Sequence, residues 1–238
     1  MRFETYGDGE APTLLVVLGF GNQPEHEHVG WLLDRLAESF AVHAAVLPVD
    51  MTDFESDYRR PVERYASGLD LTAVLSHSTG GLIAAHLPLD ARRVYCSPWW
   101  GFDLDGVGDL VFPFVRRLPV GYRFLPTGAE PEAIGDLKTP AEAAEGPDFI
   151  SPAFVREIDR AQRRLPAFRP ESQVFCSLRD RVVSVTAIGR RAPPGRVRLY
   201  DGGHEFFASS GRNAVLEDVL RALEDGPEAV AGPSMREA

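Results

Sequence analysis

One stretch of the sequence, residues 71–87, constrains the fold more than any other. It begins as an apolar run of strand length, narrows through small residues around Ser78, and continues as an amphipathic helix. A serine at such a strand-to-helix turn directs its hydroxyl out of the sheet, where the first amides and the positive dipole end of the helix also point. The turn requires strained backbone angles and small residues two positions away on either side, here Ser76 and Gly80. The alternative is a serine-rich turn that opens an ordinary strand–helix unit.

The rest of the chain alternates between strand-like and helix-like segments. Residues 13–18 are a continuous Thr, Leu and Val run, which is typical of a strand buried on both faces. Further strands are expected at residues 2–6, 41–49, 93–98, 173–178 and 196–200, and helices at 28–40, 57–69, 185–191 and 205–223. This alternation predicts an α/β fold, with a mostly parallel, doubly wound sheet and helices on both faces. Ligands bind at the carboxyl ends of the strands in such sheets, so Gly19, Ser78 and Trp99-Trp100 should share one rim.

The alternation is interrupted between residues 101 and 170, a section rich in proline and phenylalanine. Ser151 and Pro152 predict the start of a helix that runs to about Leu165, with weaker helical signals over residues 105–117 and from Thr139. We interpret this section as a cap inserted over the rim, because many long excursions are functional lids. A surface insertion without a catalytic role is the alternative. The domains expected are a core of residues 1–100 and 171–226, a cap of 101–170 and a flexible tail of 227–238.

Composition limits the classes of partner. The 238 residues suit one large α/β domain, and the formal net charge of −10 argues against nucleic acid or an anionic membrane surface. Lys138 is the only lysine, so 24 of the 25 basic residues are arginine. The chain begins without a signal-peptide pattern and lacks an apolar run of membrane-spanning length. Because Cys96 and Cys176 lie in apolar strand-like runs, we expect buried thiols in a cytoplasmic protein.

The segment His77-Ser78-Thr79-Gly80-Gly81 resembles the G-x-S-x-G nucleophile elbow of the α/β-hydrolase superfamily. Ser76 stands where that superfamily usually has glycine. The resemblance covers nearly the whole chain apart from the cap. A shorter resemblance, over residues 96–100 and the helix at 151–165, is to the lysophospholipase and monoglyceride-lipase-like serine hydrolases. It implies hydrolysis of a carboxylic ester that has an acyl or other apolar portion.

The superfamily places its catalytic residues in the order nucleophile, acid, histidine. In this sequence Ser78 is followed by Asp180, just past a predicted strand, and by His204, in a glycine turn past the last strand. A serine needs a base to remove its proton, and the base needs a third group that orients it. We therefore predict Ser78 as nucleophile, His204 as base and Asp180 as the orienting acid. Taken singly, an Asp at a strand end is usually a turn residue and a His in a glycine turn is usually structural.

An oxyanion formed during acyl transfer needs two hydrogen-bond donors. The candidates are the backbone N–H groups of Thr79, in the elbow, and Phe20, in the Leu18-Gly19-Phe20 turn, where the superfamily often has His-Gly-x. His77 and His86 flank the elbow and are expected to pack rather than to act as bases. Aromatic walls suit apolar substrates. The substrate pocket is predicted to include Gly19, Gly21, His77, Trp99 and Trp100.

No cofactor or metal is expected. The sequence lacks the glycine patterns that bind nucleotides, and Asp103, Asp105 and Asp109 lack calcium-loop spacing. The segment Glu25-His26-Glu27-His28 is interpreted as exposed charges at the start of a helix, since no matching ligand cluster accompanies it.

The sequence thus predicts a serine esterase or lipase-like hydrolase that acts on a small-molecule ester through an acyl-enzyme. The same triad could instead perform thioester or peptide hydrolysis, acyl transfer or carbon–carbon cleavage. A catalytically silent α/β-hydrolase fold that binds a ligand or partner is the other alternative, and Ser76 favours it.

Overall fold

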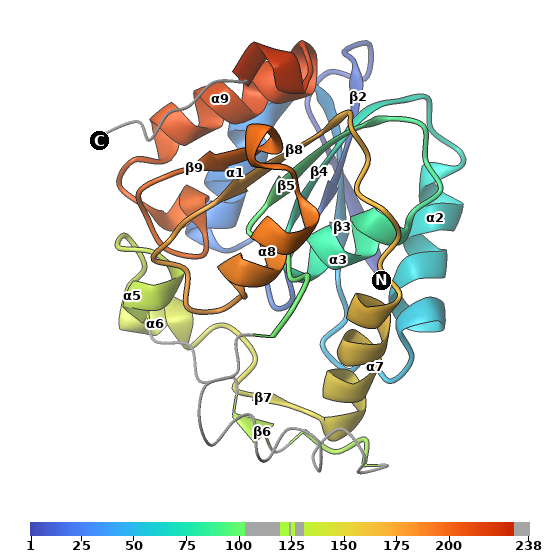
Figure 1. The fold of residues 1–238 in the computed structure, drawn as a ribbon, viewed down its shortest axis with the longest axis vertical. Coiled ribbons are helices and arrows are strands. Elements are labelled where there is room, and N and C mark those ends of the chain that lie inside the picture. Colours follow the sequence, from blue (N-terminus) through green and yellow to red (C-terminus); the bar gives the residue numbers. More distant parts are fainter. Residues whose placement is uncertain (103–119, 124, 127–130, 231–238) are drawn as a thin grey trace.

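The computed structural model describes residues 1–102, 120–123, 125–126 and 131–230 (Figure 1). Its centre is a seven-stranded sheet with the order β1-β3-β2-β4-β5-β8-β9. Neighbouring strands are parallel except for β1, which pairs antiparallel with β3 at one edge. The strands are β1 Arg2–Tyr6, β2 Thr13–Val17, β3 Ala41–Val46, β4 Leu71–His77, β5 Arg92–Cys96, β8 Ser172–Cys176 and β9 Val197–Leu199. The predicted α/β class and the mostly parallel sheet are therefore confirmed.

Helices cover both faces of the sheet, as alternating strands and helices require (Figure 1). Two of them, α1 and α9, pack on one face through leucines and valines that meet alternate residues of the strands. The π-helix η1 and helices α2, α3, α7 and α8 cover the other face. Their bounds are α1 Glu27–Ala37, η1 Glu55–Arg59, α2 Arg60–Ala66, α3 Thr79–His86, α7 Pro152–Arg163, α8 Val185–Arg191 and α9 Arg212–Glu224. No helix within the described ranges is both long and apolar enough to cross a membrane.

Short elements complete the chain. In Figure 1 the antiparallel strands β6 and β7 lie at the bottom of the molecule, and the helices α5 and α6 lie at its lower left. These elements are β6 Leu125–Pro126, α5 Pro131–Ile134, α6 Pro140–Ala143 and β7 Phe149–Ile150, and the 3-10 turns are η2 Pro194–Arg196, η3 Phe206–Ala208 and η4 Pro227–Val230. The helix predicted over residues 105–117 lies outside the described residues. The predicted starts of α6 and α7 are correct, and the side chains of Thr139 and Ser151 cap them.

Helix α7 adds Phe154, Ile158 and Ala161 to the apolar core on its face of the sheet, and Phe154 also contacts the predicted rim residues Phe20 and Trp99. Two features differ from the sequence prediction. The closing helix does not begin at Glu205. That segment forms η3 first, and α9 starts only at Arg212. Residues 227–230 are not a frayed tail, because they form η4 and its valine is buried against α9.

Close packing of α3 on β2 explains the glycine after the elbow. A Cβ on Gly80 would lie 2.1 Å from the carbonyl oxygen of Val17 and 2.6 Å from that of Leu18. Both obstacles are backbone atoms of a central strand, which cannot rotate away. Helix α3 can therefore lie this close to the sheet only because residue 80 is a glycine.

Gly80→Ala should lower the free energy of unfolding by about 1–3 kcal/mol, because overpacking against backbone displaces the helix. Gly189→Ala is the matched control, since the space around the Gly189 Cα in α8 is open. The control should leave stability unchanged or raise it slightly. Urea unfolding of both variants measures the difference, and equal stabilities would contradict the packing argument.

Candidate active site

Ser78 occupies a strained turn between β4 and α3. Its φ of 52° and ψ of −119° lie in a region that residues with side chains rarely adopt. Backbone hydrogen bonds maintain the strain: Ser78 N–H donates to the Cys96 carbonyl at 3.1 Å, and the Ser78 carbonyl accepts from Trp99 N–H at 2.9 Å. The turn is thus fixed by the end of the neighbouring strand β5. Such geometry is the one required of a nucleophile elbow.

Ser76, the departure from the usual glycine, is accommodated. Its side chain is buried, and Oγ lies 3.4 Å from the Val94 carbonyl of β5 as a long hydrogen bond. Gly80, on the other side of the elbow, is the position at which a Cβ has no room. The extra atoms of Ser76 therefore do not prevent the turn.

Asp180 and His204 meet at the carboxyl ends of β8 and β9. His204 Nδ1–H donates to Asp180 Oδ2 at 2.8 Å, and both side chains are buried. The other oxygen of Asp180 accepts from the N–H groups of Val182, at 2.8 Å, and Val183, at 3.1 Å. Burial raises the pKa of Asp180, but His204 and these amides more than offset it, so the pKa is below its usual value. The aspartate stays ionised and holds His204 in the tautomer with its proton on Nδ1.

His77 connects the elbow to the loop of His204. The two imidazole rings are 4.7 Å apart, and His77 Nε2–H donates to the His204 carbonyl at 3.3 Å. Burial lowers the pKa of His77 to about 3, so the ring is neutral at neutral pH. Nδ1 of His77 lies 3.2 Å from the side-chain oxygen of Asn22. His77 is therefore a buried connecting residue behind the elbow, which agrees with the expected packing role and disagrees with its predicted place in the substrate pocket.

The turn after β2 lies against the same histidine. Gly19 is buried, and a Cβ there would lie 2.6 Å from the Asn22 side chain and 2.7 Å from the His77 ring. Gly21 has φ of +82°, which favours glycine, and its Cα faces Pro147. The predicted donors Phe20 and Thr79 thus belong to two segments that converge on His77. Their role as an oxyanion hole stays a prediction.

Aromatic side chains gather beside this turn. The half-buried ring of Phe20 contacts Phe154 of α7, with centroids 4.6 Å apart. The ring centroid of Trp99 lies 6.0 Å from that of Phe154 and 5.1 Å from that of Phe102. Trp100, predicted beside it, instead points into the core, where its Nε1–H donates to the Gly81 carbonyl at 3.2 Å. Trp99 is at the centre of a tight turn, closed by Trp100 N–H donating to the Pro98 carbonyl at 2.8 Å, and only Trp99 joins the cluster.

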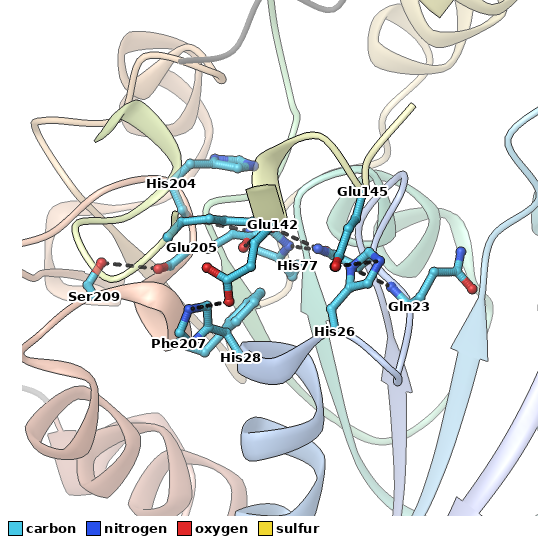
Figure 2. Close-up of polar contacts among 12 residues, drawn as sticks. Gln23, His26, His28, His77, Glu142, Glu145, His204, Glu205, Phe207 and Ser209 are labelled. Atoms are coloured by element: carbon cyan, nitrogen blue, oxygen red, sulfur yellow. Dashed lines mark hydrogen bonds and ion pairs between the residues drawn. The ribbon is translucent and has the colours of Figure 1, made fainter. Parts of the chain in front are cut away.

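The prediction of exposed charges is correct for Glu25 and Glu27 and wrong for the two histidines of the motif, which face the α6 region. His28 Nε2 lies 3.4 Å from Glu142, and His26 Nε2 lies 3.9 Å from Glu145, as Figure 2 shows. In the part of the chain that the structure describes, no three His, Cys, Asp or Glu side chains gather as metal ligands.

Glu205, Lys138 and Asn22 are the polar residues of the site that sequence reasoning missed. Glu205 follows His204 directly and is buried, and it accepts hydrogen bonds from Asn22 and Lys138 (Figure 2 shows Glu205 beside His77 and His204). One signal was present in the sequence, because a single lysine among so many arginines is unusual. Nothing in the local sequence identified its partner.

The fold defined by this sheet and elbow is the α/β-hydrolase fold, and solved structures resemble it over most of their length. No protein-family model and no curated protein matches the chain. Similar structures include a monoacylglycerol lipase of Paleococcus ferrophilus (16% identity, TM-score 0.69, 93% of this chain and 97% of the other). A soluble variant of monoglyceride lipase from Saccharomyces cerevisiae, in complex with a substrate analogue, gives 13% identity, a TM-score of 0.71 and coverage of 94% and 91%. An esterase from Rhodococcus is 15% identical, with a TM-score of 0.59 and coverage of 93% of each chain.

Asp180→Asn should lower the free energy of unfolding at pH 7 by about 1–3 kcal/mol, because charged hydrogen bonds to His204 and two amides are weakened. The folded pKa of Asp180 is depressed, so this stabilisation is present above the unfolded pKa and is lost as pH falls through the folded value. The difference from wild type should therefore shrink below about pH 4.

Asp201→Asn is the control for this prediction, since Asp201 is exposed and pairs with exposed Arg179. It should change stability by less than about 0.5 kcal/mol at either pH. Urea unfolding at pH 7 and pH 3 distinguishes the two carboxylates. A pH-independent loss in Asp180→Asn would contradict the assignment of an ionised, hydrogen-bonded aspartate.

Proposed function

We propose that this chain is a serine hydrolase that cleaves carboxylic esters with an apolar acyl group. The observation that carries the proposal is the strained turn of Ser78 beside a loop whose histidine already donates to a buried aspartate. The order Ser78, Asp180, His204 along the chain is that of the α/β-hydrolases. Similar structures are described as monoacylglycerol lipase, monoglyceride lipase and esterase, which favours ester hydrolysis among the reactions open to this fold.

In the proposed mechanism, His204 Nε2 takes the proton of Ser78 as Oγ attacks the ester carbonyl carbon. Asp180 orients the imidazole and stabilises its positive charge. The backbone N–H groups of Thr79 and Phe20 donate to the oxyanion. The alcohol leaves with a proton from His204, and water, deprotonated by the same residue, then hydrolyses the acyl-enzyme.

The preference for an apolar acyl group rests on the aromatic side chains beside the turn of residues 19–22, called the oxyanion turn here because it carries the proposed donor of Phe20. Phe20 carries one proposed oxyanion donor on its backbone, and its ring packs on Phe154, which in turn lies near Trp99. A hydrocarbon chain bound at Ser78 would leave water for this aromatic surface, and the gain grows with the area buried. A monoacylglycerol is one ester of this class.

The silent-fold alternative loses its sequence argument. It rested on Ser76, and that residue is buried and hydrogen-bonded without displacing the strained turn.

Ser78→Ala should reduce turnover of p-nitrophenyl esters by more than about 10³-fold, because it removes the nucleophile of the triad. The variant should retain the wild-type circular dichroism spectrum and fail to react with a fluorophosphonate probe. Ser67→Ala, at the exposed end of α2, is the control and should behave as wild type. Retained turnover in Ser78→Ala would overturn the proposed nucleophile.

For p-nitrophenyl esters of increasing acyl length, kcat/KM should rise about fourfold for each methylene that the aromatic surface buries. Phe154→Ala should flatten this dependence more than it lowers the rate for the acetate ester. Phe3→Ala is the matched control, because its ring stacks on Tyr65 at the far edge of the sheet. A flat series for the wild-type protein would contradict an apolar acyl site.

A further inference from the structure

A buried ion pair joins three segments around the histidine loop, which is defined here as residues 201–205. Glu205 Oε1 accepts from Asn22 Nδ2 at 2.7 Å, and Oε2 accepts from Lys138 Nζ at 3.0 Å. The side chains of Lys138 and Glu205 are only 9% and 7% exposed. Each carboxylate oxygen therefore binds a different segment: Asn22 belongs to the turn after β2, and Lys138 lies between α5 and α6.

The ionised form of Glu205 is favoured in the folded protein. Burial alone would raise the pKa of Glu205, but Lys138 and the hydrogen bond from Asn22 oppose it, and the pKa lies below its usual value. Removing two charges from water costs several kcal/mol per ion, and their attraction offsets this only when geometry is good. A buried pair is therefore weak evidence of stabilisation by itself, and its best-attested use is to specify one geometry.

Main-chain hydrogen bonds attach the histidine loop to the same segment. His204 N–H donates to the Ala133 carbonyl at 3.0 Å, and Glu205 N–H donates to that of Ile134 at 2.7 Å. Close contact accompanies them, since a Cβ on Gly203 would lie 2.5 Å from the Ile134 oxygen. The loop that carries the proposed base is therefore built onto α5 rather than standing free at the end of β9.

The polar contacts close into a circuit that returns to His204. Glu205 binds Asn22, the Asn22 amide lies against His77, and His77 donates to the His204 carbonyl. His77 is also the residue before Ser78, so the circuit touches the elbow, the oxyanion turn and the histidine loop. A displacement of any one of them would disturb a buried polar contact with another.

We propose that Glu205 and Lys138 are positioning residues, which hold His204 and the turn of residues 19–22 in register with Ser78. The proposal rests on the proposed function, because it assigns the pair a role in the reaction of Ser78. The groups touch neither Ser78 nor its substrate in the proposed mechanism. They act through Asn22, His77 and the backbone of the histidine loop.

Glu205→Gln and Lys138→Met each remove the charge attraction while they keep similar side-chain volumes. We expect kcat for a p-nitrophenyl ester, and the rate at which a fluorophosphonate labels Ser78, to fall about 10- to 100-fold, with KM changed less than threefold. The double variant should lose no more than the worse single variant, because both act on one interaction. Asn22→Ala breaks only the neutral link and should give a smaller loss of the same kind.

Arg198→Met is the matched control. Arg198 forms a similarly buried ion pair with Asp218, at 3.1 Å, between β9 and α9. This variant should lower Tm and keep kcat within about twofold, since the pair joins β9 to α9 through Asp218 and not to the histidine loop. The comparison is made between variants whose Tm falls by the same amount. If kcat then falls no further in Glu205→Gln and Lys138→Met than in Arg198→Met, the pair has only a structural role and the proposal is overturned.

Lys138 also permits a measurement on the unaltered protein. As the only lysine, it and the N-terminal amine are the sole primary amines of the chain. Mass spectrometry after treatment with an amine-acylating reagent should find Lys138 modified at least tenfold more slowly in the folded protein than in urea at the same pH, and Glu205→Gln should narrow the difference. Equal rates in the two conditions would overturn the buried pair even if a variant failed to fold.

The two proposals fail in different ways. A wild-type protein that neither hydrolyses esters nor reacts with the fluorophosphonate overturns the proposed function. A reactive wild type whose folded Glu205→Gln and Lys138→Met variants keep full kcat overturns only the positioning role.

Discussion

The strained backbone at Ser78 is the constraint on which the candidate site depends. A positive φ at a residue with a side chain costs about 1–3 kcal/mol and persists only where its surroundings determine it fully. Here the determinants are the hydrogen bonds from Ser78 N–H to Cys96 and from Trp99 N–H to Ser78, together with the contact of Gly80 with β2. The central strands therefore fix the angle at which Ser78 leaves the sheet, and every other residue of the site must be placed relative to it.

The parallel sheet by itself brings the turn after β2, Asp180 and His204 to the edge of the sheet where Ser78 lies. Strands β2, β4, β5, β8 and β9 run in one direction, so the turns that follow them open at one edge. A sheet positions strand ends to within several ångströms, however, whereas proton transfer needs heavy atoms about 2.6–3.2 Å apart. The contacts among His77, Asn22 and Glu205 act over this shorter range.

Sequence reasoning was reliable where the signal is local. The apolar run of β2, the Ser151 cap of α7 and the bounds of α8 follow from neighbouring residues, and the structure agrees with each. It failed where the determinant is distant in sequence. Glu205 and Asn22 are 183 positions apart, and Glu205 and Lys138 are 67 apart, so no periodicity could reveal their contact. For the same reason the contacts of Phe154 with Phe20 and Trp99, which are 134 and 55 positions away, could not be read from the sequence.

The histidine loop is held by the Lys138–Glu205 ion pair rather than by an apolar contact, and the reason lies in the kind of segment that this loop is. The histidine loop leaves β9 and is not part of the sheet ladder, so its position depends on side chains and on a few backbone bonds to α5. Hydrophobic contact is non-directional and would let such a loop slide by a fraction of an ångström. The carboxylate of Glu205, whose two oxygens bind donors from two different segments, has less freedom of this kind. The compact ammonium of Lys138 donates to one carboxylate oxygen, whereas the buried guanidinium of Arg93 is spread over the carbonyls of Ala84, Leu87 and Leu89.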